Sequence, residues 1–160
     1  MIEESAHKTQ RGASGGAVPG VLGERVTYLL RRVTDAAGRK ANAALAPLQI
    51  DTRHYTVLAV IGAGGGSSQR TIADTLRLDR ATVVALVDTL EALGLAKRMR
   101  SREDRRANAV EITARGRRVL SRANELMVKC ELEFVDALQP AERQSLGEML
   151  ERLLWANRHE

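Results

Sequence analysis

The chain has 160 residues, a net charge of +5 and a sequence pI of about 10.0. Aromatic residues make up only 2% of it, so the core must consist of aliphatic side chains, which favours packed helices over a β-sandwich or barrel. No apolar run approaches the ~18 residues of a membrane-spanning helix, no signal peptide is evident, and the single cysteine excludes an intramolecular disulfide framework. We therefore expect a cytoplasmic protein of one domain, with or without extensions, whose basic charge fits a polyanionic partner.

The N-terminal part of the chain combines a polar stretch with one long helical pattern. Residues 1–19 are rich in Gly, Ser, Ala and charges and have no apolar period, which predicts a flexible arm. Apolar residues recur at helical spacing from Leu22 to Ala37 and predict a first helix. We assign this helix and the connection after it to residues 20–50.

A second, shorter helix is predicted before a glycine-rich segment. Either Asp51 or Thr52 can cap this helix, which runs to about Ile61. The Gly-rich segment Gly62–Ser67 lacks the Lys-Ser/Thr that closes a P-loop, and no strand precedes it. We interpret it as a flexible connector.

The middle of the chain predicts two short helices joined by a tight turn. Ser68 can cap a helix that starts at Gln69, and Asp79 can cap the next helix. The connection Arg77–Asp79 is as short as a helix-turn-helix requires, and Gly94 is a natural stop in a left-handed conformation. Apolar residues spaced by three and four predict one buried stripe on the second helix, formed by Val83, Leu86, Val87, Leu90 and Leu93.

The exposed front of the second helix carries mostly small residues, which would let it approach base edges closely. Thr82 can hydrogen-bond a base or a phosphate, and Ala81, Val84 or Ala85 can touch a thymine methyl group. An ordinary amphipathic helix with a small-residue solvent face would show the same pattern, so this helix alone leaves both interpretations open.

A basic hairpin follows directly. Leu95–Arg100 and Ala107–Ile112 predict two short strands, with a turn at Ser101–Arg106. Between Lys97 and Arg118 there are nine basic and three acidic residues, a net charge of +6 against +5 for the whole chain. The positive charge is therefore concentrated on the hairpin and the start of the next helix, which is typical of a phosphate-binding surface. Its position after a helix-turn-helix favours DNA over a merely solvated charge run.

This stretch resembles the winged helix-turn-helix of the MarR family of bacterial transcription regulators. The similarity is carried by Leu78–Val83, Leu86–Leu95, Asp104–Arg106 and Ile112–Gly116, and it extends more weakly from about Val21 to the C-terminus. The resemblance implies a fold that is mainly α with a small β-hairpin wing, in which a winged helix-turn-helix is flanked by N- and C-terminal dimerisation helices. The DNA-binding lobe is expected at residues 51–112, between the helices of 20–50 and 113–160.

The resemblance also implies roles for the wing residues. Asp104 would orient the wing, and Arg102, Arg105 or Arg106 would enter the minor groove; the sequence does not choose among these three. Many family members carry polar or basic residues where this chain has Val84, Ala85 and Thr89, so readout is expected to depend more on the wing and the remaining polar positions. The complete set predicted to contact DNA is Ser68, Gln69, Arg70, Arg80, Ala81, Thr82, Val84, Ala85, Asp88, Arg98, Arg100, Arg102, Asp104, Arg105 and Arg106.

Two more helices are predicted at the C-terminus. Thr113 caps a long helix that runs to about Leu138, and Pro140 opens a last helix that ends near Trp155. Their apolar surface exceeds what a small wing can cover, so we expect them to pack with the first helix and with a second copy of the chain. Such a homodimer would place two recognition helices about one DNA turn apart, ~34 Å, on a pseudo-palindromic operator of double-stranded DNA.

The resemblance further implies a small aromatic or anionic effector that weakens DNA binding, and Tyr28, Arg32, His54 and Tyr55 are the candidate contacts. Cys130 lies in an apolar stripe and is expected to be a core residue. The histidines share no ligand spacing with it, so no metal is expected, and no cofactor or catalytic pattern is found.

The predicted function is a dimeric, sequence-specific transcriptional regulator, most simply a repressor released by an effector. The alternatives are a non-specific architectural DNA-binding protein and, ranked last, a metabolite-binding or enzymatic module.

Overall fold

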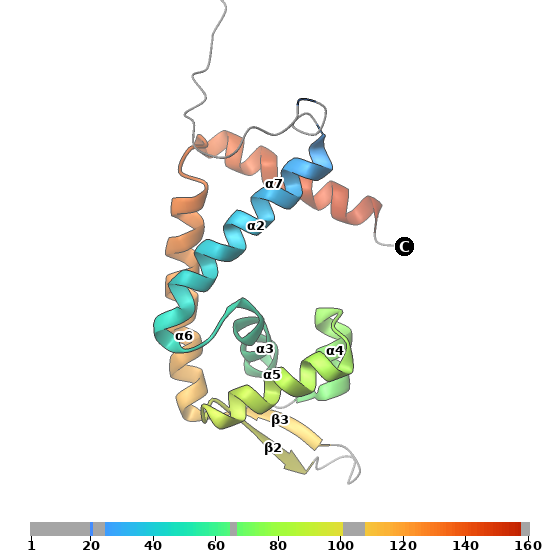
Figure 1. Cartoon of the computed structure of the whole chain (residues 1–160), viewed down its shortest axis with the longest axis vertical. Coiled ribbons are helices and arrows are strands. Elements are labelled where there is room, and N and C mark those ends of the chain that lie inside the picture. The colour runs from blue at the N-terminus through green and yellow to red at the C-terminus, as the bar shows by residue number, and fades with distance from the viewer. Residues whose placement is uncertain (1–19, 21–24, 65–66, 101–107, 158–160) are drawn as a thin grey trace, which may run out of the picture. The chain divides into compact units, whose positions relative to one another are not determined.

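Helices make up most of the described residues, and a small antiparallel sheet completes the fold (Figure 1). The structure, a computed structural model, describes residues 20, 25–64, 67–100 and 108–157. The chain divides into two compact units, Met1–Thr34 and Asp35–Glu160. In chain order the elements are α2 (Val26–Leu45), the 3₁₀ turn η1 (Ala46–Leu48), α3 (Thr52–Ala63), β1 (Ser67–Ser68), α4 (Gln69–Leu76), α5 (Arg80–Ala92), β2 (Ala96–Arg100), β3 (Asn108–Ile112), α6 (Ala114–Phe134) and α7 (Pro140–Ala156). The predicted class, mainly α with a small β wing, is confirmed.

The sheet has the strand order β1-β3-β2, and both neighbouring pairs are antiparallel. β2 and β3 form the predicted hairpin, in which Arg98 pairs with Val110. The interpretation of Gly62–Ser67 as a connector is wrong at both ends, because Gly62 and Ala63 complete α3 and Ser67 pairs with Val110. A strand of two residues has no detectable period, so the sequence does not predict β1.

Side-chain caps start four of the helices at residues that the sequence offered as caps. The Ser68 hydroxyl accepts a hydrogen bond from the backbone N–H of Thr71 at 3.0 Å, and the Thr113 hydroxyl accepts one from Gly116 at 2.9 Å. The sequence left two candidates for the cap of α3, and the structure selects Asp51, whose carboxylate accepts from the N–H of His54 at 2.9 Å. Each such cap typically contributes ~1 kcal/mol to helix stability.

The core of the second unit lies between α3, α4, α5, the sheet and the first half of α6. Four residues of the predicted α5 stripe are buried, and Leu93 is half-buried at the edge of the core. Burial of each large aliphatic side chain contributes roughly 1.5–3 kcal/mol. The largest fully buried side chains are Leu45, Leu58, Ile61, Ile72, Leu90, Leu95, Val57, Val83, Val87 and Val110.

The long C-terminal helix is shorter than predicted. α6 ends at Phe134, four residues before Leu138, because the chain turns there and the N–H of Leu138 bonds the carbonyl of Val135 at 2.9 Å. α7 then begins at Pro140, as predicted, with the backbone N–H of Gln139 donating to Glu142 Oε2 at 2.7 Å.

The connection after α2 lies within the predicted range of residues 20–50 and begins with a short turn. α2 ends at Leu45, and Ala46–Leu48 forms a 3₁₀ turn that contains Pro47. Proline has no N–H to continue the α-helical ladder, which explains the change of geometry. Gln49 ends this turn in the left-handed region, with φ of 59°.

No residue of α7 is buried. Its exposed aliphatic residues include Leu146, Met149, Leu153 and Leu154, and Val128 and Leu132 are exposed on α6. None of the helices in the described ranges is long and apolar enough to cross a membrane.

Candidate nucleic-acid interface

α4 and α5 form a helix-turn-helix through the predicted connection Arg77–Asp79. α4 ends where Arg77 takes a left-handed backbone conformation, with φ of 52°. The N–H of Leu78 then bonds the carbonyl of Ala73 at 3.0 Å, which closes the turn. Figure 1 shows α5 next to the hairpin of β2 and β3, so the second helix and the wing belong to the same lobe.

Asp79 fixes the start of α5 through two hydrogen bonds from one residue. Its carboxylate accepts from the Thr82 N–H at 2.8 Å and from the Thr82 hydroxyl at 2.5 Å. The hydroxyl bond is the largest of the causes that lower the pKa of Asp79 below its ordinary value. Because the Thr82 hydroxyl donates to Asp79, its oxygen can only accept from a ligand, which excludes donation to a phosphate while the cap is intact.

The exposed face of α5 is apolar over slightly more than its first turn. Ala81, Val84 and Ala85 are exposed, and their spacing of three and four places them on the same side of the helix. Thr89, one turn later, donates its hydroxyl to the carbonyl of Ala85 at 3.0 Å. Methyl groups therefore dominate the surface that this helix offers to a ligand.

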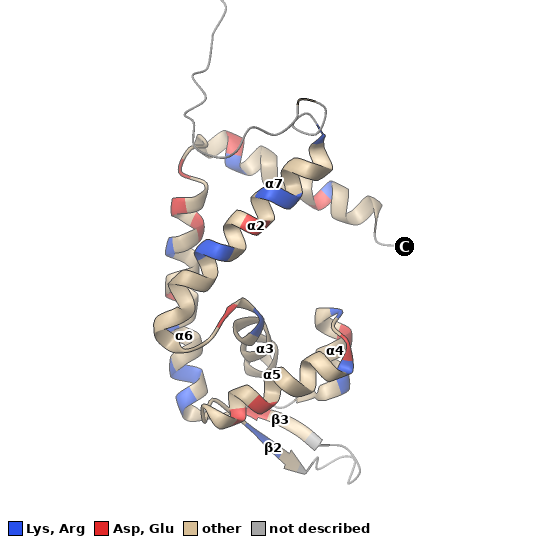
Figure 2. Cartoon of the chain, in the orientation of Figure 1, with Lys and Arg blue, Asp and Glu red and all other residues tan. Residues whose placement is uncertain are grey.

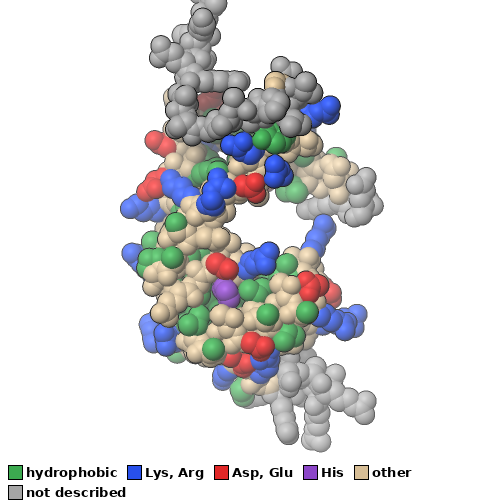
Figure 3. All heavy atoms as spheres, viewed as in Figure 1, with side chains coloured by type: hydrophobic (Ala, Val, Ile, Leu, Met, Phe, Trp, Pro, Cys, Tyr) green, Lys and Arg blue, Asp and Glu red, His purple; other side chains and the backbone are tan. Residues whose placement is uncertain are grey.

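Arg98 on β2 is paired within the lobe. Its Nη2 lies 2.7 Å from Asp88 Oδ1, its Nη1 bonds Glu91 Oε2, and its backbone N–H donates to Glu91 Oε1 at 2.5 Å. With its amide oxygen turned toward the guanidinium, Gln69 accepts from Nη2 at 2.8 Å and from Nε at 3.0 Å. We call these four residues the Arg98 cluster. Figure 2 colours acidic residues on α5 and basic residues on β2, and Figure 3 shows acidic and basic side chains close together over this part of the molecule.

The electrostatics of the cluster follow from its composition. Burial alone would lower the pKa of Arg98, but the hydrogen bond to Asp88 and the charges of Glu91 and Asp88 outweigh it and raise the pKa above its ordinary value. Arg98 is therefore permanently charged, and it faces two carboxylates. Its side chain is only 26% exposed, so its charge is largely committed to internal partners.

Other basic residues remain on the surface of the lobe. Figure 2 shows Lys and Arg on β2 and along the first turns of α6, the end of that helix next to the sheet. In α6 these are Arg115, Arg117 and Arg118, all exposed. On α4, exposed Arg70 lies 3.8 Å from Asp74, a surface pair that leaves the cation accessible. Arg80 is exposed at the first turn of α5.

The structure brings the predicted residues of α4, α5 and β2 into one lobe. Four predicted wing residues, Arg102, Asp104, Arg105 and Arg106, lie outside the described residues. Arg100 is the last residue of β2, and its backbone pairs with Asn108.

Sequence reasoning missed Glu91, the second carboxylate that binds Arg98. A signal was available: Asp88 and Glu91 are three residues apart, so both fall on one side of α5. The partner on β2 could not be chosen from sequence, because the pairing depends on how the strand packs on the helix.

The residues predicted to contact an effector lie in different units. In the first unit, the Tyr28 hydroxyl accepts from Arg32 Nη1 at 3.2 Å, and the guanidinium of Arg31 lies 5.5 Å from the Tyr28 ring centre. In the second unit, His54 Nδ1 lies 2.6 Å from Asp51 Oδ1, and the Tyr55 hydroxyl donates to Asn124 Oδ1 at 2.9 Å.

Asp51 holds His54 in its ionised, carboxylate form. Burial raises its pKa, but hydrogen bonds from His54 and the charge interaction with it outweigh burial, so the pKa is lowered.

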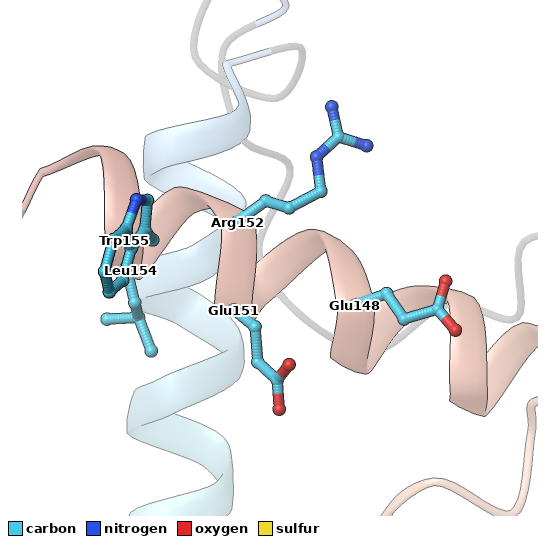
Figure 4. A pocket seen from close by; sticks show the side chains of 5 residues that line it. All are labelled: Glu148, Glu151, Arg152, Leu154 and Trp155. Atoms are coloured by element: carbon cyan, nitrogen blue, oxygen red, sulfur yellow. The ribbon is translucent and has the colours of Figure 1, made fainter.

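Open hollows lie on the C-terminal helices. One of about 820 Å³ is lined only by α7, by Glu148, Glu151, Arg152, Leu154 and Trp155, which project in different directions from that helix (Figure 4). Another of about 450 Å³ lies between α6 and α7.

Cys130 is buried, as predicted. Across the described ranges, no cluster of His, Cys, Asp or Glu could hold a metal ion.

Comparison with known proteins places this architecture in a family. The family model described as MarR family matches residues 48–107. A protein of Thauera aromatica described as a transcriptional regulatory protein for the hcr operon is 32% identical over 139 residues, which cover 86% of this chain and 81% of that protein.

Two solved structures extend the similarity to the fold. The transcriptional repressor CouR bound to a 23-mer DNA duplex is 33% identical with a TM-score of 0.78, covering 84% of this chain and 95% of that one. CouR from Rhodococcus jostii RHA1 bound to p-coumaroyl-CoA is 28% identical with a TM-score of 0.74, covering 85% and 94%. Members of the family are transcriptional regulators and not enzymes. The chain belongs to the MarR family of winged helix-turn-helix, DNA-binding transcriptional regulators.

Proposed function

We propose that the chain is a homodimeric repressor that binds a specific DNA sequence and leaves it when a small molecule binds. The observation that carries this proposal is the lobe in which α5, capped by Asp79, exposes a small-residue face beside the basic strand β2. The similarity to CouR, a repressor with a structure on duplex DNA, supports it.

In this proposal α5 enters the major groove, whose width admits an α-helix. Ala81, Val84 and Ala85 face thymine methyl groups, and Arg80 at the first turn reaches a phosphate or base edge. The N-terminus of α4, with Ser68, Gln69 and exposed Arg70, lies against the phosphate backbone, because free amides at a helix N-terminus favour anions. The wing arginines that follow Arg98 in the chain, Arg100, Arg102, Arg105 and Arg106, contact backbone or minor groove.

The dimer is proposed from the apolar surface of α6 and α7. Leu153 and Leu154 are 46% and 68% exposed, and Met149 is 57% exposed on the same helix. Large apolar side chains exposed in this number on one helix suggest an interaction site. We propose that a second copy of the chain covers it, which produces two recognition helices related by a twofold axis.

The effector is proposed to be a small aromatic or anionic molecule. CouR is seen with p-coumaroyl-CoA, which combines an aromatic acyl group with negatively charged phosphates. Tyr28, Arg32, His54 and Tyr55 are the proposed contacts. A titration of p-coumaroyl-CoA and of free p-coumarate into the protein–DNA complex tests this part: release of DNA is expected, and retention at saturating levels of both contradicts an effector of this chemistry.

Competition binding tests the DNA-binding function itself. The protein is titrated onto fragments of the source genome at moderate salt, with bulk DNA as competitor. Specific regulators of this kind bind their site typically 10³–10⁷ times more tightly than other DNA. A preference of this order supports the proposal, whereas equal affinity for all fragments identifies a non-specific architectural protein instead. An in vitro transcription assay from the preferred fragment then shows whether binding represses.

The wing is tested separately by single substitutions. Arg105→Ala or Arg106→Ala is expected to weaken specific binding by about 1–3 kcal/mol if that side chain makes a good groove contact. The comparison with Arg102→Ala identifies which arginine reads DNA. Unchanged affinity in all three variants would contradict a DNA-reading wing.

A further inference from the structure

The Arg98 cluster connects three elements of the DNA-binding lobe. Arg98 lies on β2, Asp88 and Glu91 lie on α5, and Gln69 is the first residue of α4. No other ion pair of the described residues joins β2 to α5. One side chain therefore sets the wing strand against both helices of the helix-turn-helix.

The chemistry of arginine suits this task. The planar guanidinium presents several donors in a fixed fork, so three acceptors on two helices define its position and orientation. The bond from the Arg98 backbone N–H to Glu91 Oε1, at 2.5 Å, fixes the strand itself and not only the side chain. A lysine could supply the charge but not the fork.

The neighbouring cation on the same strand is placed differently. Lys97 lies 3.4 Å from Glu111 across the hairpin, and the two side chains are 49% and 39% exposed, against 26% for Arg98. Successive side chains of a strand point to opposite faces, so Lys97 and Arg98 face apart. The Lys97–Glu111 pair stays within the sheet and does not reach α5.

We propose that Arg98 is a positioning residue for DNA recognition: it holds the wing and the recognition helix in the geometry that matches the operator and does not itself neutralise a phosphate. This inference rests on the proposed sequence-specific binding and deepens it. It also assigns Asp88 a role through Arg98, as a partner that restrains the guanidinium, and Gln69 a role as the link to α4.

The direction in which one substitution changes the affinity for the specific site distinguishes a positioning role from simple electrostatics. Asp88→Ala removes a negative charge from a DNA-binding surface, so charge alone predicts tighter binding to any DNA. Positioning predicts the opposite for the specific site, because the guanidinium loses a restraint. Glu111→Ala is the matched control, since it removes the same charge from the pair with Lys97, outside the Arg98 cluster.

The experiment measures affinity for a selected site and for random-sequence DNA over a range of salt concentrations. The proteins are the wild type, Arg98→Gln, Arg98→Lys, Asp88→Ala, the charge-balanced double variant Arg98→Gln/Asp88→Ala, and Glu111→Ala. Thermal unfolding of each variant establishes that it is folded at the assay temperature, and Arg98→Lys supplies the conservative change if Arg98→Gln is too unstable.

We expect Arg98→Gln, Arg98→Lys and Asp88→Ala each to lose roughly 10-fold in specific affinity, with binding to random DNA unchanged within about twofold. The double variant should be no worse than the poorer single variant, and its salt dependence should equal that of the wild type. A phosphate contact would instead lower the slope of log K against log salt by ~0.9 in the double variant.

A reduced slope, full rescue by Arg98→Lys, or tighter specific binding by Asp88→Ala would overturn the inference while leaving the proposed function intact. A wild-type protein that prefers no sequence would overturn the proposed function, and this inference with it.

Discussion

Gly116 explains why α6 can start against the end of the recognition helix. A Cβ at this position would lie 2.0 Å from the carbonyl oxygen of Leu95 and 2.8 Å from Ile112 Cγ1. The same junction is closed by Thr113, whose hydroxyl donates to the Gly94 carbonyl at 2.8 Å, and by Gly94, whose φ of 68° favours glycine. A side chain at residue 116 therefore requires the backbone of Leu95 to move.

We predict that Gly116→Ala lowers the free energy of unfolding by about 1–3 kcal/mol, because the backbone of Leu95 must move. Gly38→Ala is the matched control: it lies within α2, and a Cβ there would meet nothing within 4 Å. Alanine favours a helix over glycine by ~1 kcal/mol, so this control should be neutral or more stable. Thermal unfolding of both variants checks the prediction, which fails if Gly116→Ala unfolds at the wild-type temperature.

A second prediction at the scale of a single residue concerns Asp79, which caps α5. Hydrogen bonds from Thr82 lower the pKa of Asp79 in the folded state, so its contribution to stability is present above the unfolded pKa of ~3.9 and is lost as pH falls through the folded pKa. Asp79→Asn keeps an acceptor for the cap but does not titrate. We expect the wild type to lose more thermal stability than this variant between about pH 6 and pH 3. Equal losses would show that Asp79 does not contribute to acid sensitivity.

At the scale of the element, α5 has an unusual surface for a DNA-reading helix. Its exposed face carries the side chains of Ala81, Val84 and Ala85, while the Thr82 hydroxyl donates to Asp79 and the Asp88 carboxylate is paired with Arg98. Its readout is therefore proposed to depend on contact with methyl groups more than on hydrogen bonds. Thymine is the natural base that presents a methyl group in the major groove.

Replacement of single thymines by deoxyuridine tests this proposal, because it removes only the methyl group. At a contacted position we expect a roughly fourfold loss of affinity, which corresponds to burial of one methyl-sized group at ~0.8 kcal/mol. In the Val84→Ala variant, the loss of affinity on replacement by deoxyuridine should become smaller at the thymine that Val84 contacts and should not change at the other thymines. The control is the same replacement outside the half-sites. If deoxyuridine leaves the affinity unchanged at every thymine of the half-sites, readout through methyl groups is contradicted.

Local signals predicted where several helices begin, whereas pairing between distant parts of the chain determined features that the sequence did not predict. Ser68 and Asp79 cap their helices through residues three positions away, so each cap is visible in a short window of sequence. The two residues of β1 depend on strand β3, about forty positions later in the chain. Arg98 was predicted to contact DNA from its charge and position, whereas its internal partners depend on the packing of β2 against α5.

At the scale of the whole molecule, α7 is a helix without a buried residue, and the homodimer is proposed to bury it. We predict that Leu153→Asp, which places a charge on the exposed apolar face, shifts the protein toward monomers in sedimentation experiments and weakens operator binding, because two linked lobes bind more tightly than one. Ser121→Asp, which adds the same charge at an exposed polar position of α6, should remain dimeric. A Leu153→Asp variant that stays dimeric would place the interface elsewhere.

Selection of bound DNA from a random pool tests the central claim most directly. Two DNA-binding lobes related by a twofold axis should select sequences that have the same twofold symmetry. We predict enrichment of two inverted half-sites whose centres lie about 10–10.5 base pairs apart, or a multiple of that spacing. Enrichment of a single unpaired motif, or of no motif, would contradict a dimeric, sequence-specific regulator.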